Sequence, residues 1–315
     1  MSDSNDKTNY ESIVQRLAFA AINEQRRSRR WRIFFLFLFF AYITIVGIVL
    51  MDSSGSAGRQ LSDEGKHTAL VQMPGIIAID EKSGAETVIA GLESAFKHEE
   101  TAGVILEINS PGGSPVQSAY IYDEIKRLRR KYESIPLYVV VVDIAASGGY
   151  FVAAAADRIY VNKSSLVGSI GVRMDNFGFV ELMQKLGIER RLLTAGENKG
   201  LFDPFLPEDA GQKAHLQQML NEVHQHFIDS VKQGRGERLS QQEDLFSGLI
   251  WTGEKAIELG LVDELGTTKS VARDVIKAET VINFTPKSQL LDRIAERIGA
   301  VMAQQMQTFF RSNIK

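Results

Sequence analysis

Residues 137–156 read LYVVVVDIAASGGYFVAAAA, an apolar run followed by a glycine-containing turn and then by small residues. The run of valines favours a strand buried on both faces, and the alanine-rich run favours a helix. The same order occurs upstream, where GVILEINSPGG at 103–113 precedes a helical pattern over 116–132. Strands that alternate with single helices pair in parallel, so the sequence predicts an α/β fold.

Further elements are expected on both sides of these two units. The apolar patterns predict strands at 75–80 and 158–161, and helices at 85–98, 207–233 and 251–259. A folded domain is therefore expected over residues 72–284. After it, the apolar residues of 285–315 recur at helical spacing, which predicts an amphipathic C-terminal helix.

The most apolar stretch lies near the N-terminus. Residues 33–51 read IFFLFLFFAYITIVGIVLM without a charge and are long enough, as a helix, to cross a bilayer. Arginines crowd the preceding residues, so the positive-inside rule predicts a cytoplasmic segment 1–30, a transmembrane anchor 31–51 and a domain outside the cytoplasm. A cleaved signal peptide is disfavoured by the long leader, and a buried soluble helix by the phenylalanine-rich, charge-free run. Residues 52–71, rich in Ser, Gly and Asp, are expected to form a linker.

Composition excludes several kinds of chemistry. The chain has no cysteine, which removes disulfides, thiolate nucleophiles and cysteine-ligated metals. Its formal net charge of -3 gives no indication of a nucleic-acid partner. No nucleotide-binding glycine fingerprint occurs, and neither a cofactor nor a metal is expected. A nucleophile must therefore be an oxygen or an amine.

Two glycine-containing turns follow apolar strands and could serve catalysis. The turn NSPGG at 109–113 lets a ligand approach backbone amides, as an oxyanion site requires, although a plain strand-to-helix turn looks the same. Ser147 lies between the strand expected at 137–142 and the alanine-rich helix that follows it. A helix N-terminus stabilises developing negative charge. The alternative is that Ser147 only caps the helix.

The histidines offer no good base for such a serine. The five are His67, His98, His215, His224 and His226, so none lies between residues 99 and 214. His67 falls in the expected linker, His98 in the surface-like run KHEE, and His224 and His226 in a charged helical stretch where solvation is expected. A Ser-His-Asp triad can assemble from distant positions, but no histidine recommends itself.

Lysine is the alternative base, and Lys199 has an unusual setting. It lies in LTAGENKGLFDPF at 193–205, where Leu201, Phe202 and Phe205 could form an apolar wall. A lysine acts as a base only in its neutral form, and desolvation favours that form. An ordinary loop lysine is the alternative that this segment alone leaves open.

Together these motifs resemble those of the S49 peptidases, of the signal peptide peptidase A type, in the short form with one catalytic unit per chain. The motifs are SPGG at 110–113, AASGGY at 145–150, SLVGSIGV at 165–172, AGENKG at 195–200 and LIWTGEKAIELGLVDELG at 249–266. They occur in the family's order, and the resemblance covers about residues 72–270. It implies a crotonase-like (ClpP-like) fold with an N-terminal transmembrane helix, in agreement with the alternation of strands and helices.

The resemblance also implies roles for individual residues. Ser147 matches the family's nucleophile, Lys199 its general base and Ser169 the serine that orients the lysine. The amides of Gly148 and Gly113 match the oxyanion hole. In short-form members, neighbouring subunits of a ring supply the serine and the lysine, so a homo-oligomer is expected.

The function implied is that of a membrane-anchored serine endopeptidase with a Ser/Lys dyad. Its substrates would be residual signal peptides, cleaved at the outer face of the bacterial inner membrane. Two other functions are left open by the residues. A crotonase-type acyl-CoA enzyme would use the same oxyanion architecture, but a membrane anchor opposes its cytosolic location. A non-catalytic, membrane-anchored ring scaffold would use the glycine turns only structurally.

Overall fold

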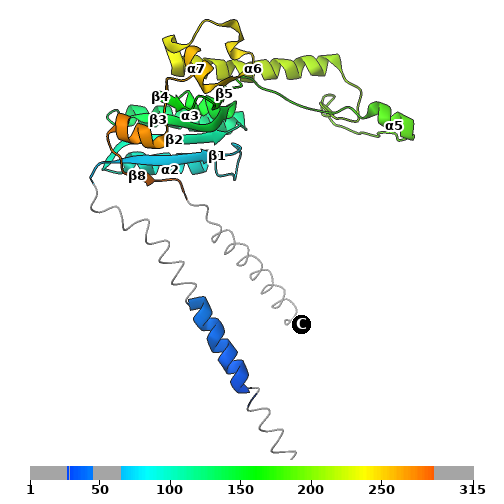
Figure 1. Ribbon diagram of the computed structural model, residues 1–315. Helices are drawn as coiled ribbons and strands as arrows, with labels where there is room; N and C mark the ends of the chain where they lie inside the picture. Colours follow the sequence, from blue (N-terminus) through cyan, green and yellow to red (C-terminus); the bar gives the residue numbers. More distant parts are fainter. Residues whose placement is uncertain (1–26, 28, 45–64, 287–315) are drawn as a thin grey trace, which may run out of the picture. The chain divides into compact units, whose positions relative to one another are not determined.

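The computed structural model describes residue 27 and residues 29–44 and 65–286, in two units that divide after Gly65 (Figure 1). In the first unit, residues 29–44 are helical and expose large apolar side chains, among them Phe37 and Tyr42. No helix within the described ranges is both long and apolar enough to cross a membrane. The end of the expected anchor, residues 45–51, and nearly all of the expected C-terminal helix lie outside those ranges.

The second unit is an α/β domain built on one mixed sheet (Figure 1). Its strands are β1 (His67–Pro74), β2 (Thr101–Ser110), β3 (Leu137–Ala146), β4 (Arg158–Val161), β5 (Leu166–Gly168), β6 (Ile250–Thr252), β7 (Glu264–Leu265) and β8 (Val281–Asn283). Its α-helices are α2 (Ala85–Lys97), α3 (Pro115–Lys131), α4 (Gly148–Ala153), α5 (Val180–Leu186), α6 (Ala210–Arg235), α7 (Gly253–Glu258) and α8 (Thr268–Ser270). Two 3-10 turns, η1 (Gly236–Arg238) and η2 (Glu243–Phe246), and a π-helical turn, η3 (Val271–Ile276), complete the described elements.

Strand β3 is the branching point of the sheet. The main order is β6-β5-β3-β2-β1-β8, and β4 pairs with both β3 and β7. Residues 138–140 of β3 pair with β4, whereas residues 144–146 pair with β5. Every pairing is parallel except that of β5 with β6. The carboxyl ends of β2, β3 and β5 therefore meet at one edge of the sheet.

The two faces of the sheet bury different side chains. Along β2, Val104, Leu106 and Ile108 belong to the large core formed with α2, α3 and α4, as the alternation of a strand requires. Ile105 points the other way, into a smaller cluster that contains Val271 of η3. The parallel strands are thus covered on both faces, as the apolar runs predict.

The structure corrects the expected first strand and the expected linker. The strand is β1, from His67 to Pro74, so residues 67–71 belong to the sheet and not to a linker. The expected strand at 75–80 is not formed: β1 ends at Pro74, Gly75 follows with a φ of 83°, and Ile77 then pairs with Gly113 in an isolated parallel bridge. Ile76 and Ile79 in this irregular segment are 61% and 72% exposed. The long helix begins at Ala210 instead of residue 207, since the Asp209 side chain accepts a hydrogen bond from the amide of Gln212.

The C-terminal end of α6 is anchored by a buried ion pair. The guanidinium of Arg235, a residue only 2% exposed, contacts both carboxylate oxygens of Asp263 at 2.8 and 2.9 Å and donates to the carbonyl of Gly260. Burial raises the pKa of Asp263, but hydrogen bonds from Arg235 and from the amide of Ile159 outweigh it and hold that pKa below its ordinary value. The pair joins α6 to the loop before β7.

Replacing Arg235 by methionine should destabilise the domain, because the largely buried Asp263 carboxylate loses both contacts with Arg235 and keeps only Arg238, at 3.2 Å, as a cationic partner. The expected loss in the free energy of unfolding is about 3–5 kcal/mol. Chemical denaturation of the full chain followed by circular dichroism measures it. A matched control is Arg158→Met, whose ion pair with Glu264 is 54% exposed on each side and is expected to contribute less than about 1 kcal/mol. Equal effects of the two substitutions would contradict this role of Arg235.

Candidate active site

Ser147 occupies the junction between β3 and α4. Its φ of 51° and ψ of -123° are strained for a residue with a side chain, and such strain is characteristic of functional sites. Its backbone is fixed on both sides: the amide donates to the carbonyl of Gly168 at 2.8 Å, and the carbonyl accepts from the amide of Phe151 at 2.9 Å. The half-buried side chain makes no capping hydrogen bond. The structure therefore does not support the simple alternative that Ser147 caps the helix.

The glycines of the SPGG turn lie directly beside Ser147. A Cβ atom added to Gly112 would come within 2.8 Å of both the Ser147 Cβ and the amide nitrogen of Gly148. A Cβ atom on Gly148 would lie 3.3 Å from the amide nitrogen of Gly113. Glycine is thus required at position 112, since any side chain there would displace the serine.

Two backbone amides at this place are available to a ligand. The amide of Gly112 donates to the hydroxyl of Ser110 at 3.1 Å, and that of Ser114 to the carbonyl of Ile77 at 2.7 Å. Among the hydrogen bonds of the described residues, none is donated by the intervening amide of Gly113. The Gly148 amide belongs to the first turn of α4, where no carbonyl of the helix can accept from it. The Gly113 and Gly148 amides are suited to hold an oxyanion.

Ser169 lies at the end of the neighbouring strand. Gly168 of β5 pairs with Ala146 of β3, so the residues that follow them, Ser169 and Ser147, occupy equivalent positions at the sheet edge. Both have a φ of 51°. The amide of Ser169 donates to the carbonyl of Leu249 at 2.7 Å, which fixes the turn against the segment before β6. The structure thus brings four of the five expected site residues together.

Lys199, the fifth, lies apart from them in the same chain. It is exposed, between α5 and α6, in a segment that extends away from the sheet beyond the N-terminal end of α6 (Figure 1). Its amide donates to the carbonyl of Gly196. Within the ranges that the structure describes, no hydrogen bond or ion pair involves its ammonium group. A single copy therefore does not assemble Ser147 and Lys199.

The segment that carries Lys199, residues 171–226, is here called the arm. No residue of the arm is buried, yet many of its side chains are apolar: Phe177 is 77% exposed and Leu193 is 97% exposed. The arm has some internal order, because the Phe179 and Phe205 rings stack with centroids 5.5 Å apart. An exposed apolar segment of this kind is typical of surfaces that bind a protein, a membrane or a ligand.

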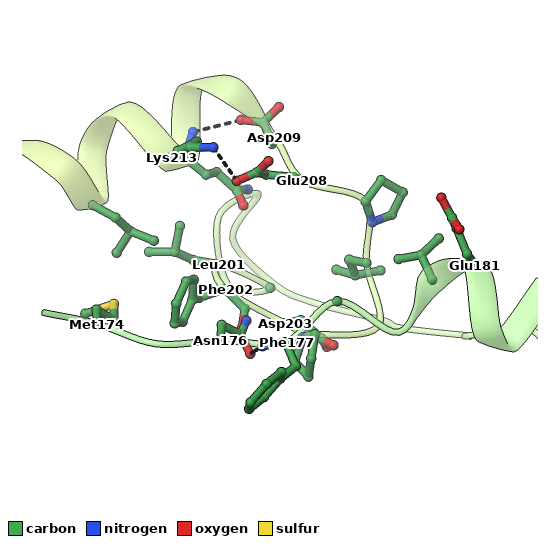
Figure 2. Close-up of a pocket in the computed structure, with 18 residues that line it drawn as sticks. Met174, Asn176, Phe177, Glu181, Leu201, Phe202, Asp203, Glu208, Asp209 and Lys213 are labelled. Carbon is green, nitrogen blue, oxygen red and sulfur yellow. Dashed lines mark hydrogen bonds and ion pairs between the residues drawn. The ribbon is translucent and has the colours of Figure 1, made fainter.

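A cavity of about 900 Å³ opens between the irregular segments of the arm and the N-terminal ends of α5 and α6 (Figure 2). Its wall is apolar near Leu201 and Phe202, and Lys213 at its rim is ion-paired to Glu208 at 2.9 Å. Asp203 binds Arg190 at 2.8 Å. The backbone amide of Phe205 and the Arg190 guanidinium hold the pKa of Asp203 below its ordinary value.

Two of the histidines, His67 and His224, differ from what their sequence context indicates. His67 is buried at the start of β1, with its ring 4.8 Å from that of His98. His224 is half-buried, and its Nε2 lies 2.9 Å from the carbonyl oxygen of Ile170. Neither contact reaches Ser147. Among the described residues, no three His, Cys, Asp or Glu side chains are grouped so that they could hold a metal ion.

The sequence contains a pattern that could have predicted the half-buried position of His224. Residue 224 stands three positions before Phe227 and seven before Val231, the two apolar residues of α6 that are buried. This spacing places the three residues on one face of the helix. His226 is outside that register and is exposed, as expected.

Two family models match parts of this chain. The family model described as peptidase family S49 matches residues 129–281, and the one described as Clp protease matches residues 70–167. The Clp protease match agrees with the expected ClpP-like fold.

Among similar proteins, one of Methanocaldococcus jannaschii named as a protease is 33% identical over 80% of this chain and 83% of its own length. A protein of Enterococcus faecium named as a signal peptide peptidase, SppA, is 30% identical over 63% of this chain and 57% of its own length. A Brucella abortus protein named as the Na(+)/H(+) antiporter NhaA is 46% identical over 66% of this chain. The chain spans only 28% of the length of that Brucella protein, so the match concerns one part of it. By these matches the chain belongs to peptidase family S49.

Proposed function

We propose that the chain is a membrane-anchored serine endopeptidase that uses Ser147 as its nucleophile and Lys199 as its general base. The observation that carries the proposal is the surroundings of Ser147. Its hydroxyl makes no capping bond, its backbone is strained, and the amides of Gly113 and Gly148 lie beside it. This arrangement is suited to acyl transfer, in which an alkoxide attacks a carbonyl and the amides hold the resulting oxyanion.

The reaction follows from these groups. The neutral Nζ of Lys199 accepts the proton of the Ser147 hydroxyl, and Oγ attacks the carbonyl carbon of the peptide bond. The amides of Gly113 and Gly148 donate to the tetrahedral oxyanion, and Lys199 then protonates the leaving amine. Water, deprotonated by the same lysine, hydrolyses the acyl-enzyme. The Ser169 hydroxyl, at the equivalent position of the next strand, holds the lysine in place.

We propose further that the lysine comes from a neighbouring copy in a ring-shaped homo-oligomer. Lys199 lies on the arm, and the arm exposes apolar side chains that a monomer leaves in water. Packing of the arm against a second copy would cover these side chains and bring a lysine to Ser147. Leu201 and Phe202, which follow Lys199 closely in the chain, would then help to exclude water from around it.

The membrane and the substrate belong to the same proposal. The charge-free run at 33–51, with arginines before it, supports a single-pass anchor with the N-terminus in the cytoplasm and the peptidase domain outside the bacterial inner membrane. Anchoring would hold the domain beside the bilayer, where cleaved signal peptides remain after protein export. The relative named as a signal peptide peptidase supports such apolar peptides as substrates.

Substitution of either member of the dyad should abolish hydrolysis. In the assembled full chain, Ser147→Ala and Lys199→Ala are each expected to lower kcat by about 10⁴-fold or more, because the members of such a unit act together. Cleavage of a fluorogenic peptide with a signal-peptide core measures the effect. Lys213→Ala is the matched control: this arm lysine is ion-paired with Glu208, and its loss is expected to leave kcat unchanged. Full activity of either dyad variant would exclude this mechanism.

Mixing the two inactive variants tests whether the dyad is shared between copies. When Ser147→Ala and Lys199→Ala subunits are unfolded together and reassembled in equal amounts, about a quarter of the junctions should pair an intact serine with an intact lysine. Activity should therefore return to roughly a quarter of the wild-type value. Mixtures with the double variant Ser147→Ala/Lys199→Ala are the control and should stay inactive. No recovery in rings that contain both variants would place the dyad within one chain.

A further inference from the structure

His224 joins the two ends of the arm. The chain leaves the core after Ile170, which is fully buried, and the next buried residue is Phe227 in α6. Between these points, His224 Nε2 lies 2.9 Å from the carbonyl oxygen of Ile170, across 54 residues of sequence. A carbonyl oxygen only accepts hydrogen bonds, so Nε2 carries the proton and His224 is the donor.

The carbonyl that His224 binds belongs to the turn of Ser169. The other bonds of this turn are made by its backbone: the Ser169 amide donates to Leu249, the Gly171 amide to Ser169, and the Gly168 carbonyl accepts from Ser147. A φ of 51° is unfavourable for Ser169 and persists only where the surroundings restrain it. The imidazole of His224 supplies such a restraint from outside the turn.

The helix that carries His224 is itself fixed against the nucleophile's helix. Phe227 of α6 packs on Phe151 of α4 with ring centroids 5.0 Å apart. One residue before the end of α6, a Cβ atom on Gly234 would come within 1.9 Å of the carbonyl oxygen of Ala154, which follows α4, so the two backbones are in close contact. Because α4 starts directly after Ser147, α6 is a rigid reference for the position of that serine.

We infer that His224 is a positioning residue for hydrolysis: its Nε2 proton, donated to Ile170, sets the turn of Ser169 and the base of the arm relative to Ser147. The inference rests on the proposed function, since Ser169 and the arm act there on the catalytic lysine. Removal of the His224 imidazole leaves Ser147, Lys199 and both oxyanion amides in the chain. The defect is therefore one of geometry, which affects the chemical step more than substrate binding.

Three substitutions at position 224 separate the effect of the hydrogen bond donated to Ile170 from the effect of side-chain size. His224→Ala removes the donor and is expected to lower kcat about 10- to 100-fold, with KM changed less than about threefold. His224→Gln places an amide N–H near the position of Nε2 and should restore kcat to within about threefold of wild type. His224→Glu matches glutamine in size but presents only acceptors when ionised, so it should be as impaired as alanine. His226→Ala, two residues along the same exposed helix, is the control and should behave as wild type.

The outcomes distinguish this inference from the proposed function. Each variant is assayed after its assembly has been confirmed by light scattering and its fold by circular dichroism. Wild-type kcat in His224→Ala, or equal kcat in the glutamine and glutamate variants, would overturn the positioning role of His224 while leaving the dyad intact. A rise in KM at unchanged kcat would also overturn it. Failure of the proposed function appears separately, as activity that survives Ser147→Ala. If the alanine variant does not assemble, the matched glutamine and glutamate pair decides.

Discussion

The hydrogen bond from the Ser147 amide to the Gly168 carbonyl, 2.8 Å long, holds the parts of the site in register. It lies where β3, having left β4, pairs with β5 at its last residues. The bond joins the two strand ends from which Ser147 and Ser169 project, both with left-handed backbone. The SPGG turn can lie directly against Ser147, because Gly112 has no side chain that would displace the serine.

Much of the fold was predictable because its central strands are continuous apolar runs. β3 and β4 begin where the pattern predicts them, and α2, α3 and α7 differ from it by only a few residues. β1 was missed because it carries polar residues whose partners exist only in the folded chain: Thr68 donates to the Ala278 carbonyl and Gln72 to Glu107. The isoleucines of the segment 75–80 predict a strand, yet the positive φ of Gly75 ends β1, and only an isolated bridge at Ile77 follows. The local pattern of apolar residues shows neither the long-range hydrogen bonds of β1 nor the end of the strand at Gly75.

The candidate site likewise contains some residues whose positions the sequence predicts and others whose positions it does not. Ser147, Gly148 and Gly113 follow apolar strands, and parallel strands bring such turns to one edge without further information. The location of Lys199 could not be foreseen, because no residue of the arm is buried and no apolar pattern therefore fixes its place relative to the core. His224 was expected to be solvated because its neighbours in sequence are charged. Its register with Phe227 and Val231 on the buried face of α6 outweighed those neighbours.

The close contact of Gly234 with Ala154 has a mechanical consequence. Two helices that contact each other through side chains can shift relative to one another when the side chains change rotamer. A direct contact between backbones does not allow such a shift. Helix α6 therefore couples the arm to α4 mechanically, because a displacement of the outer end of α6 cannot be absorbed where Gly234 meets Ala154. Any partner that engages the arm would then shift the helix that begins directly after Ser147, and its binding would be felt as a change in turnover.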